Sequence, residues 1–125
     1  MVSTLLQVAL GGALGASARY LSGHAIMRFA GPGFPFGTLF VNVLGSFVMG
    51  AFAVYAAERS ATSLAPFVMT GILGGFTTFS AFSLDTLTLI ERGETGLALL
   101  YVAGSVAVSI GALWLGLFVA RGVFA

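Results

Sequence analysis

Four long apolar segments constrain the fold of this 125-residue chain more than any other feature of its sequence. They cover residues 2–21, 37–57, 66–90 and 96–118. A transmembrane helix needs roughly 20 predominantly apolar residues. A segment that crosses lipid must also satisfy its own backbone hydrogen bonds, which a helix does. The segments therefore predict an all-α integral membrane protein with four transmembrane helices, in one membrane domain over residues 1–125.

The composition agrees with a membrane protein and excludes several other classes. Only 7% of the residues are charged and 58% are hydrophobic, whereas soluble domains carry roughly 25% charged residues. Four acidic residues nearly balance five arginines, so no basic face is available for nucleic acid. The chain has no cysteine and therefore no disulfide or thiolate metal site. No basic region precedes the first apolar segment, so we interpret it as a span rather than a cleaved signal. We expect a multi-pass protein of the inner cell membrane.

The arginines are distributed almost evenly over the two sides of the predicted bundle. Arg59 and Arg121 fall on one side, Arg28 and Arg92 on the other, and Arg19 lies near the end of the first span. The arginine excess that orients most membrane proteins is therefore nearly absent. Either other factors fix one orientation, or the chain has dual topology, which permits an antiparallel homodimer. Four spans could hardly enclose an aqueous path alone, so we expect oligomerisation on either interpretation.

Small residues recur at four-residue spacing and predict close helix packing. Gly11 and Gly15 form a G-x-x-x-G pattern in the first span, and Ser46 and Gly50 are four apart in the second. Small faces allow helix backbones to approach one another in lipid. We interpret these positions as packing surfaces.

Polar side chains within the spans indicate something more than packing, because they are costly in hydrocarbon unless they meet a partner or line water. The second span carries Asn42, with Thr38 one turn earlier. The fourth span carries Tyr101, Ser105 and Ser109 at four-residue spacing, which puts them on one face of a helix. Each serine alone could donate to a carbonyl of its own helix. Three hydroxyls in register, with an asparagine available opposite, favour a polar track.

The stretch "GGFTTFSAFSLD", residues 74–85, predicts a break in the third helix near the middle of the membrane. Gly74, Gly75 and the following threonines are poor helix formers. A break frees backbone groups, and membrane proteins tolerate this where protein, an ion or water satisfies those groups. Discontinuous helices are one way to build ion sites within a membrane. We predict that the chain unwinds at Gly74, that Thr77 ends the break, and that the helix resumes at Phe79.

Phe79 and Phe82 lie three residues apart, so they share one face of the half-helix that follows the break. This spacing is usually explained by lipid contact or core packing. Their position among hydroxyls, directly after a helix break, favours a second explanation. The edge of an aromatic ring is positive, so the two rings could present their edges to a passing anion.

Several motifs resemble one known family. They are "GGALGASARY" (11–20), "GTLFVNVLGSF" (37–47) and "GGFTTFSAFSLDT" (74–86), followed by the spaced hydroxyls of the fourth span. The chain resembles the Fluc family of fluoride channels, also called CrcB proteins, over essentially its whole length. The resemblance implies a fluoride-selective channel that exports cytoplasmic fluoride passively. It also implies an antiparallel, dual-topology homodimer with two pores and a central structural sodium ion.

The resemblance also implies roles for individual residues. It puts Arg19 in a vestibule, and it assigns the sodium ion to the backbone carbonyls of Gly74 and Thr77 from both subunits. Asp85 stands where many members have glutamate, a change of length but not of charge. The positions that the resemblance assigns to the pore or to fluoride binding are Thr38, Asn42, Phe79, Ser80, Phe82, Tyr101, Ser105 and Ser109.

Three other functions compete with a channel. A small dual-topology, proton-coupled exporter would need a carboxylate within the membrane, for which Asp85 is the only candidate. An accessory subunit of a larger complex would explain the small-residue faces, but not the hydroxyls or the break. An enzyme is not expected, because the single histidine, His24, has no carboxylate or cysteine near it in the sequence.

Overall fold

The computed structural model describes residues 1–125, and these residues form only helices and the turns between them. The predicted all-α class is confirmed. In chain order the elements are α1 (Val2–Ala30), α2 (Phe36–Glu58), the short 3₁₀ turn η1 (Thr62–Leu64), the π-helix η2 (Pro66–Leu73), α3 (Gly74–Phe76), α4 (Phe79–Glu91) and α5 (Thr95–Phe124).

Three helical stretches are long and apolar enough to cross a membrane, namely Phe36–Glu58, Thr62–Glu91 and Thr95–Phe124. They correspond to the second, third and fourth predicted spans. The first predicted span lies within α1, which has 29 residues and is therefore long enough to cross a bilayer. The mean hydropathy of α1 is too low for it to count with those three stretches, because Gln7 and Arg19 interrupt its apolar sequence.

Two helices are longer than the spans predicted from hydropathy. α1 continues to Ala30 rather than ending at residue 21, and α5 continues to Phe124 rather than ending at 118. α1 ends where Gly31 adopts a left-handed φ of 80° and donates its N–H to the carbonyl of Met27. Pro32, which cannot continue a helix, follows. Hydropathy therefore marked the apolar part of each helix and missed the helical turns beyond it.

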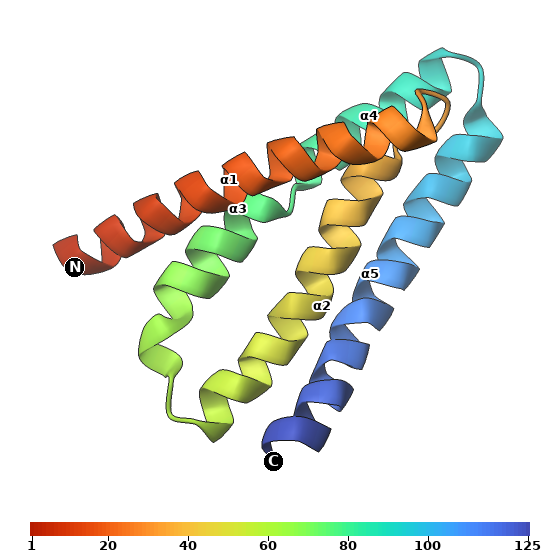
Figure 1. Cartoon of the computed structure of the whole chain (residues 1–125). Helices are drawn as coiled ribbons and strands as arrows, with labels where there is room; N and C mark the ends of the chain where they lie inside the picture. Colours follow the sequence, from red (N-terminus) through yellow and green to blue (C-terminus); the bar gives the residue numbers. More distant parts are fainter.

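The helices are held together by close backbone contacts at glycines. α2 and α5 run side by side in Figure 1, and α1 crosses at an angle and packs on η2 and α3. A β-carbon at Gly15 would overlap the carbonyl oxygen of Ile72, and one at Gly11 would overlap that of Phe67. The predicted packing role of this glycine pair is confirmed.

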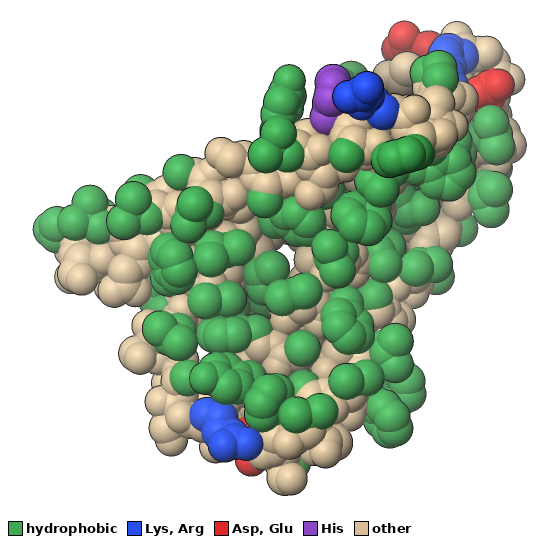
Figure 2. All heavy atoms as spheres, viewed as in Figure 1, with side chains coloured by type: hydrophobic (Ala, Val, Ile, Leu, Met, Phe, Trp, Pro, Cys, Tyr) green, Lys and Arg blue, Asp and Glu red, His purple; other side chains and the backbone are tan.

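Most apolar side chains lie on the outside of the chain. Only 18 of the 125 residues are buried, and Figure 2 shows apolar side chains spread over the visible surface. An apolar surface of this extent is typical of contact with lipid or with another protein chain rather than with water. The architecture is that of a multi-pass membrane protein.

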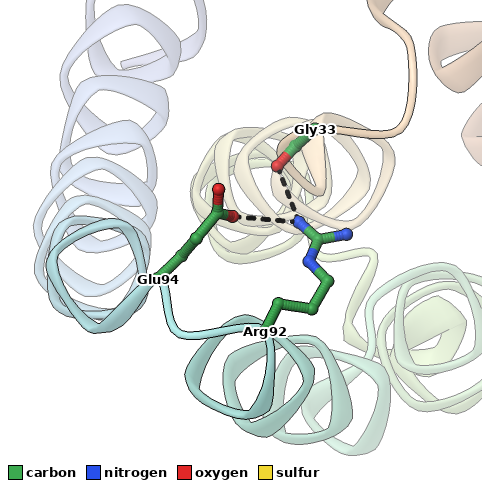
Figure 3. A network of polar contacts seen from close by, with 3 residues as sticks. All are labelled: Gly33, Arg92 and Glu94. Carbon is green, nitrogen blue, oxygen red and sulfur yellow. Dashed lines mark hydrogen bonds and ion pairs between the residues drawn. The ribbon is translucent and has the colours of Figure 1, made fainter.

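Polar contacts fix the loops at one end of the bundle. Arg92, in the turn before α5, donates from one guanidinium nitrogen to the carbonyl of Gly33 at 3.0 Å and pairs with Glu94 at 3.2 Å (Figure 3). Gly33 belongs to the turn between α1 and α2. The first and third loops therefore lie together, as a four-helix up-and-down chain requires.

Candidate functional site

The helix break consists of two threonines between α3 and α4. Thr77 has φ −91° and ψ 159°, and Thr78 has φ −151° and ψ 124°, so both are extended. The prediction of a broken third segment that resumes at Phe79 is confirmed. The prediction that Gly74 unwinds is wrong, because Gly74 is helical, with φ −63° and ψ −36°. Thr77 was predicted to end the break, but it begins it, and Thr78 is the last extended residue. Its neighbour Gly75 instead serves packing, since a β-carbon there would lie 2.8 Å from the carbonyl oxygen of Gly12.

Asn42 on α2 holds the extended backbone of Thr78. The amide N–H of Thr78 donates to Asn42 Oδ1 at 2.7 Å, and Asn42 Nδ2 donates to the Thr78 carbonyl at 2.9 Å. The Thr78 hydroxyl then caps α4 by accepting from the amide of Ala81 at 3.1 Å. Both backbone groups of Thr78 therefore have partners although no helix supplies them. The predicted amide donor does lie at the site, but one of its two N–H groups is used by the backbone.

The carbonyls before the break have unequal surroundings. Arg19 Nε donates to the Gly75 carbonyl at 2.9 Å, so the structure places the predicted vestibule arginine against the break. Both the amide and the hydroxyl of Thr77 donate to the carbonyl of Leu73, at 3.1 and 2.9 Å. No amide beyond the break donates to the carbonyls of Gly74 or Thr77. Those two carbonyls retain free lone pairs.

A carboxylate organises a second group of predicted residues. Asp85 Oδ2 accepts from Thr38 Oγ1 at 2.7 Å and from the Tyr101 hydroxyl at 3.2 Å. The three side chains come from α4, α2 and α5, so these contacts link three helices. Thr38 and Tyr101 were predicted to supply hydroxyls to an anion. In the structure both hydroxyl protons are already donated to Asp85, and Tyr101 is buried.

A cavity of about 400 Å³ lies between α2, the break and α5. It brings together five of the predicted residues: Asn42, Phe79, Phe82, Ser105 and Ser109. It also includes Ser46, Thr77 and Thr78, to which the sequence analysis gave no pore-side hydroxyl role. Thr38, Ser80 and Tyr101 are not part of its lining. The Ser80 hydroxyl instead lies 3.3 Å from that of Thr78 at the start of α4.

The serines of α5 do not bond to their own helix. The Ser105 hydroxyl is buried and has no hydrogen-bond partner, and no hydrogen bond from Ser109 to a helix carbonyl is present. Ser83 and Thr88 on α4, by contrast, donate to the carbonyls of Phe79 and Leu84 at 3.0 and 2.8 Å. A buried hydroxyl without an acceptor is unfavourable. The polar track, rather than helix back-bonding, is therefore the interpretation that the structure favours for the α5 serines.

The two predicted phenylalanines meet at one end of this cavity. Their ring centroids are 5.4 Å apart with the planes inclined at 48°. Phe82 is buried and its ring also contacts Tyr101 at 5.1 Å. Phe79 is 78% exposed on the single chain. One ring therefore belongs to the core and the other stands at the surface, where a second chain or lipid would cover it.

A larger groove of about 860 Å³ lies between the end of α1, α2 and α5. All twelve residues that line it are hydrophobic, among them Phe29, Phe40 and Phe47. It offers no hydrogen-bond donor and could not replace the water around an ion. The smaller cavity is therefore the candidate functional site.

Comparison with known proteins identifies the family. The model of the family described as CrcB-like protein, Camphor Resistance (CrcB), matches residues 6–117. The chain belongs to the CrcB family. A relative from Ruegeria sp. (strain TM1040) is 61% identical over 124 residues, which cover 98% of each chain. Another from Agrobacterium fabrum is 50% identical over 119 residues, 94% of this chain and 95% of the relative. Both relatives are named fluoride-specific ion channel FluC.

Membership of the family confirms the resemblance drawn from the motifs. It also confirms that the chain is not an enzyme, because the family consists of ion channels. Two features of the site were not predicted from the sequence. One is the contact of Asn42 with Thr78, which no local pattern reveals. The other is the position of Ser46, whose spacing of one helical turn from Asn42 was a usable signal.

Proposed function

We propose that this chain forms a fluoride-selective channel through which cytoplasmic fluoride leaves the cell passively across the inner membrane. One observation carries the proposal: a buried hydroxyl without a partner, that of Ser105, lines a cavity that also contains Asn42, Ser109 and the Phe79–Phe82 pair. The names of the relatives, which cover almost the full chain, support fluoride as the ion.

The chemistry of the cavity suits a small, strongly hydrated anion. Hydroxyl and amide N–H groups can replace the water around fluoride, whereas ionised carboxylates cannot donate. The lining includes no charged side chain. Conduction requires sites from which the ion can leave, and a fixed cation in the cavity would retain it. The edges of Phe79 and Phe82 add a weak attraction for an anion.

We also propose that two chains associate antiparallel, with one pore along the cavity of each. The support is the near balance of arginines across the two sides and the exposure of the break face, where Gly74 and Phe79 are open to the outside. A second chain would cover that face.

Single cysteines at residues 33 and 60, which lie in loops on opposite sides of the bundle, test the orientation of the chains. We expect each to be labelled by an impermeant reagent from both sides of the membrane. Labelling of each from one side only would contradict dual topology.

A structural sodium ion at the centre of such a dimer is the third element of the proposal. The free carbonyls of Gly74 and Thr77 fit a hard cation, which prefers oxygen ligands. Two carbonyls from each chain would provide four oxygens, and the ion would add positive charge at the interface without placing a charge in the pores. Dimer stability that does not change when sodium is exhaustively replaced by a bulky organic cation would argue against this site.

Fluoride efflux from liposomes that contain the purified protein tests the function. We expect fluoride to leave passively, with a rate that follows the membrane voltage and with chloride largely excluded. The pH inside and outside is held equal in one arm and different in the other. Efflux that occurs only with a proton gradient would favour the proton-coupled exporter instead. No fluoride efflux in either arm would contradict both.

A further inference from the structure

Ser46 lines the cavity, although it was predicted only as a helix-packing position and has no assigned role in fluoride binding. It lies on α2, one turn beyond Asn42, and its side chain is half-buried. None of the side-chain hydrogen bonds in the structure involves it. Its hydroxyl is therefore free to donate into the cavity.

Several hydroxyls on the third helical segment differ from Ser46, because they are already bonded within that segment. Thr77, Ser83, Thr86 and Thr88 each donate to a carbonyl one turn earlier in the sequence. That is the usual way in which a hydroxyl within a helix is satisfied in apolar surroundings. Ser105 and Ser109, which line the same cavity, also lack such a bond. Three serines without a side-chain hydrogen bond therefore line the same cavity.

The position of Ser46 on α2 places it on a different wall from the α5 serines. Just beyond Ser46, the backbones of α2 and α5 lie very close together. A β-carbon at Gly50 would overlap the carbonyl of Leu113, and a β-carbon at Gly116 would overlap the carbonyl of Phe47. The two walls are therefore held together by backbone contact. A hydrated anion that enters the cavity loses water on every side and needs donors from more than one helix.

We propose that Ser46 is a further fluoride-binding donor, which acts from the α2 wall opposite Ser105 and Ser109. The inference rests on the proposed fluoride channel. The competing explanation is that a small residue is needed at position 46 for packing, in which case alanine would serve equally well.

Liposome efflux at several fluoride concentrations, with the Ser46→Ala and Ser46→Thr variants, separates the two explanations. Loss of one hydrogen bond to an anion corresponds to roughly a tenfold weakening. We therefore expect Ser46→Ala to require about ten times more fluoride for half-maximal flux. Ser46→Thr keeps the hydroxyl and should recover most of this loss. Dimer assembly should be unchanged in both variants.

Ser83→Ala is the matched control, because it removes a hydroxyl that is already bonded within α4. It should leave the concentration dependence as in the wild type. Wild-type behaviour of Ser46→Ala, or an equal loss in Ser46→Ala and Ser46→Thr, would overturn the inference while the proposed function stands. A wild-type protein that passes no fluoride would instead overturn the proposed function, and the inference with it.

Discussion

Replacing Phe82 or Phe79 with isoleucine is expected to reduce fluoride flux by about tenfold or more, since a loss of only ~1.4 kcal/mol in ion stabilisation corresponds to that factor. Isoleucine keeps the apolar bulk but removes the ring and its positive edge. Phe82 also contacts Tyr101, with ring centroids 5.1 Å apart, so its loss affects the position of the tyrosine that donates to Asp85. The measurement is efflux from liposomes at matched amounts of assembled dimer.

Phe118→Ile is the control for this prediction. Phe118 lies on α5, stacks on Trp114 at 5.8 Å and is 63% exposed away from the cavity. The same change of side chain there should leave the flux close to the wild type. If the variants at 79, 82 and 118 lose flux equally, the phenylalanine pair acts only in packing.

The helices of this chain could be predicted because their signal is local. Apolar runs of bilayer length located α2, and η2 with α4, to within a few residues, and they located the start of α5 but not its end at Phe124. Beyond residue 21, α1 continues through a less apolar stretch that includes His24 and Arg28, so its full extent to Ala30 was missed. The π-helix before the break was also missed, because no residue pattern in "PFVMTGIL" distinguishes it from an α-helix.

The position of the break depends on a residue far away in the sequence. Glycine is the poorer helix former, and from local propensity Gly74 was the better candidate. The structure opens at Thr77 and Thr78 because Asn42, on another helix, supplies both partners for the Thr78 backbone. Helix propensity contains no information about that contact.

The hydroxyl stripe of α5 shows the same limit. Four-residue spacing correctly placed Tyr101, Ser105 and Ser109 on one face. The spacing could not show that residues on this face have different surroundings. The tyrosine donates to Asp85, whereas the two serines line the cavity. Periodicity identifies the side of a helix on which residues lie, but their partners depend on the neighbouring helix.

Asn42→Asp is expected to be at least as damaging as loss of a phenylalanine, although it conserves the shape of the side chain. An aspartate can still accept from the Thr78 amide, but it cannot donate to the Thr78 carbonyl. The carbonyl is left without a partner, at a cost of about 1–3 kcal/mol. The carboxylate also places a negative charge beside the proposed anion path, where the low dielectric strengthens repulsion. A penalty of ~3 kcal/mol on the ion would reduce flux by roughly a hundredfold.

Gln7→Glu makes the same amide-to-carboxylate change on α1, outside the lining of the cavity. The two variants are compared by efflux and by thermal unfolding of the dimer. The comparison separates the effect of a negative charge at the cavity from the effect of a negative charge elsewhere in the protein. We expect Asn42→Asp to lower both flux and unfolding temperature, and Gln7→Glu to leave the flux near the wild type. An Asn42→Asp protein that conducts normally would mean that the break holds its shape without the asparagine contact and that fluoride passes elsewhere.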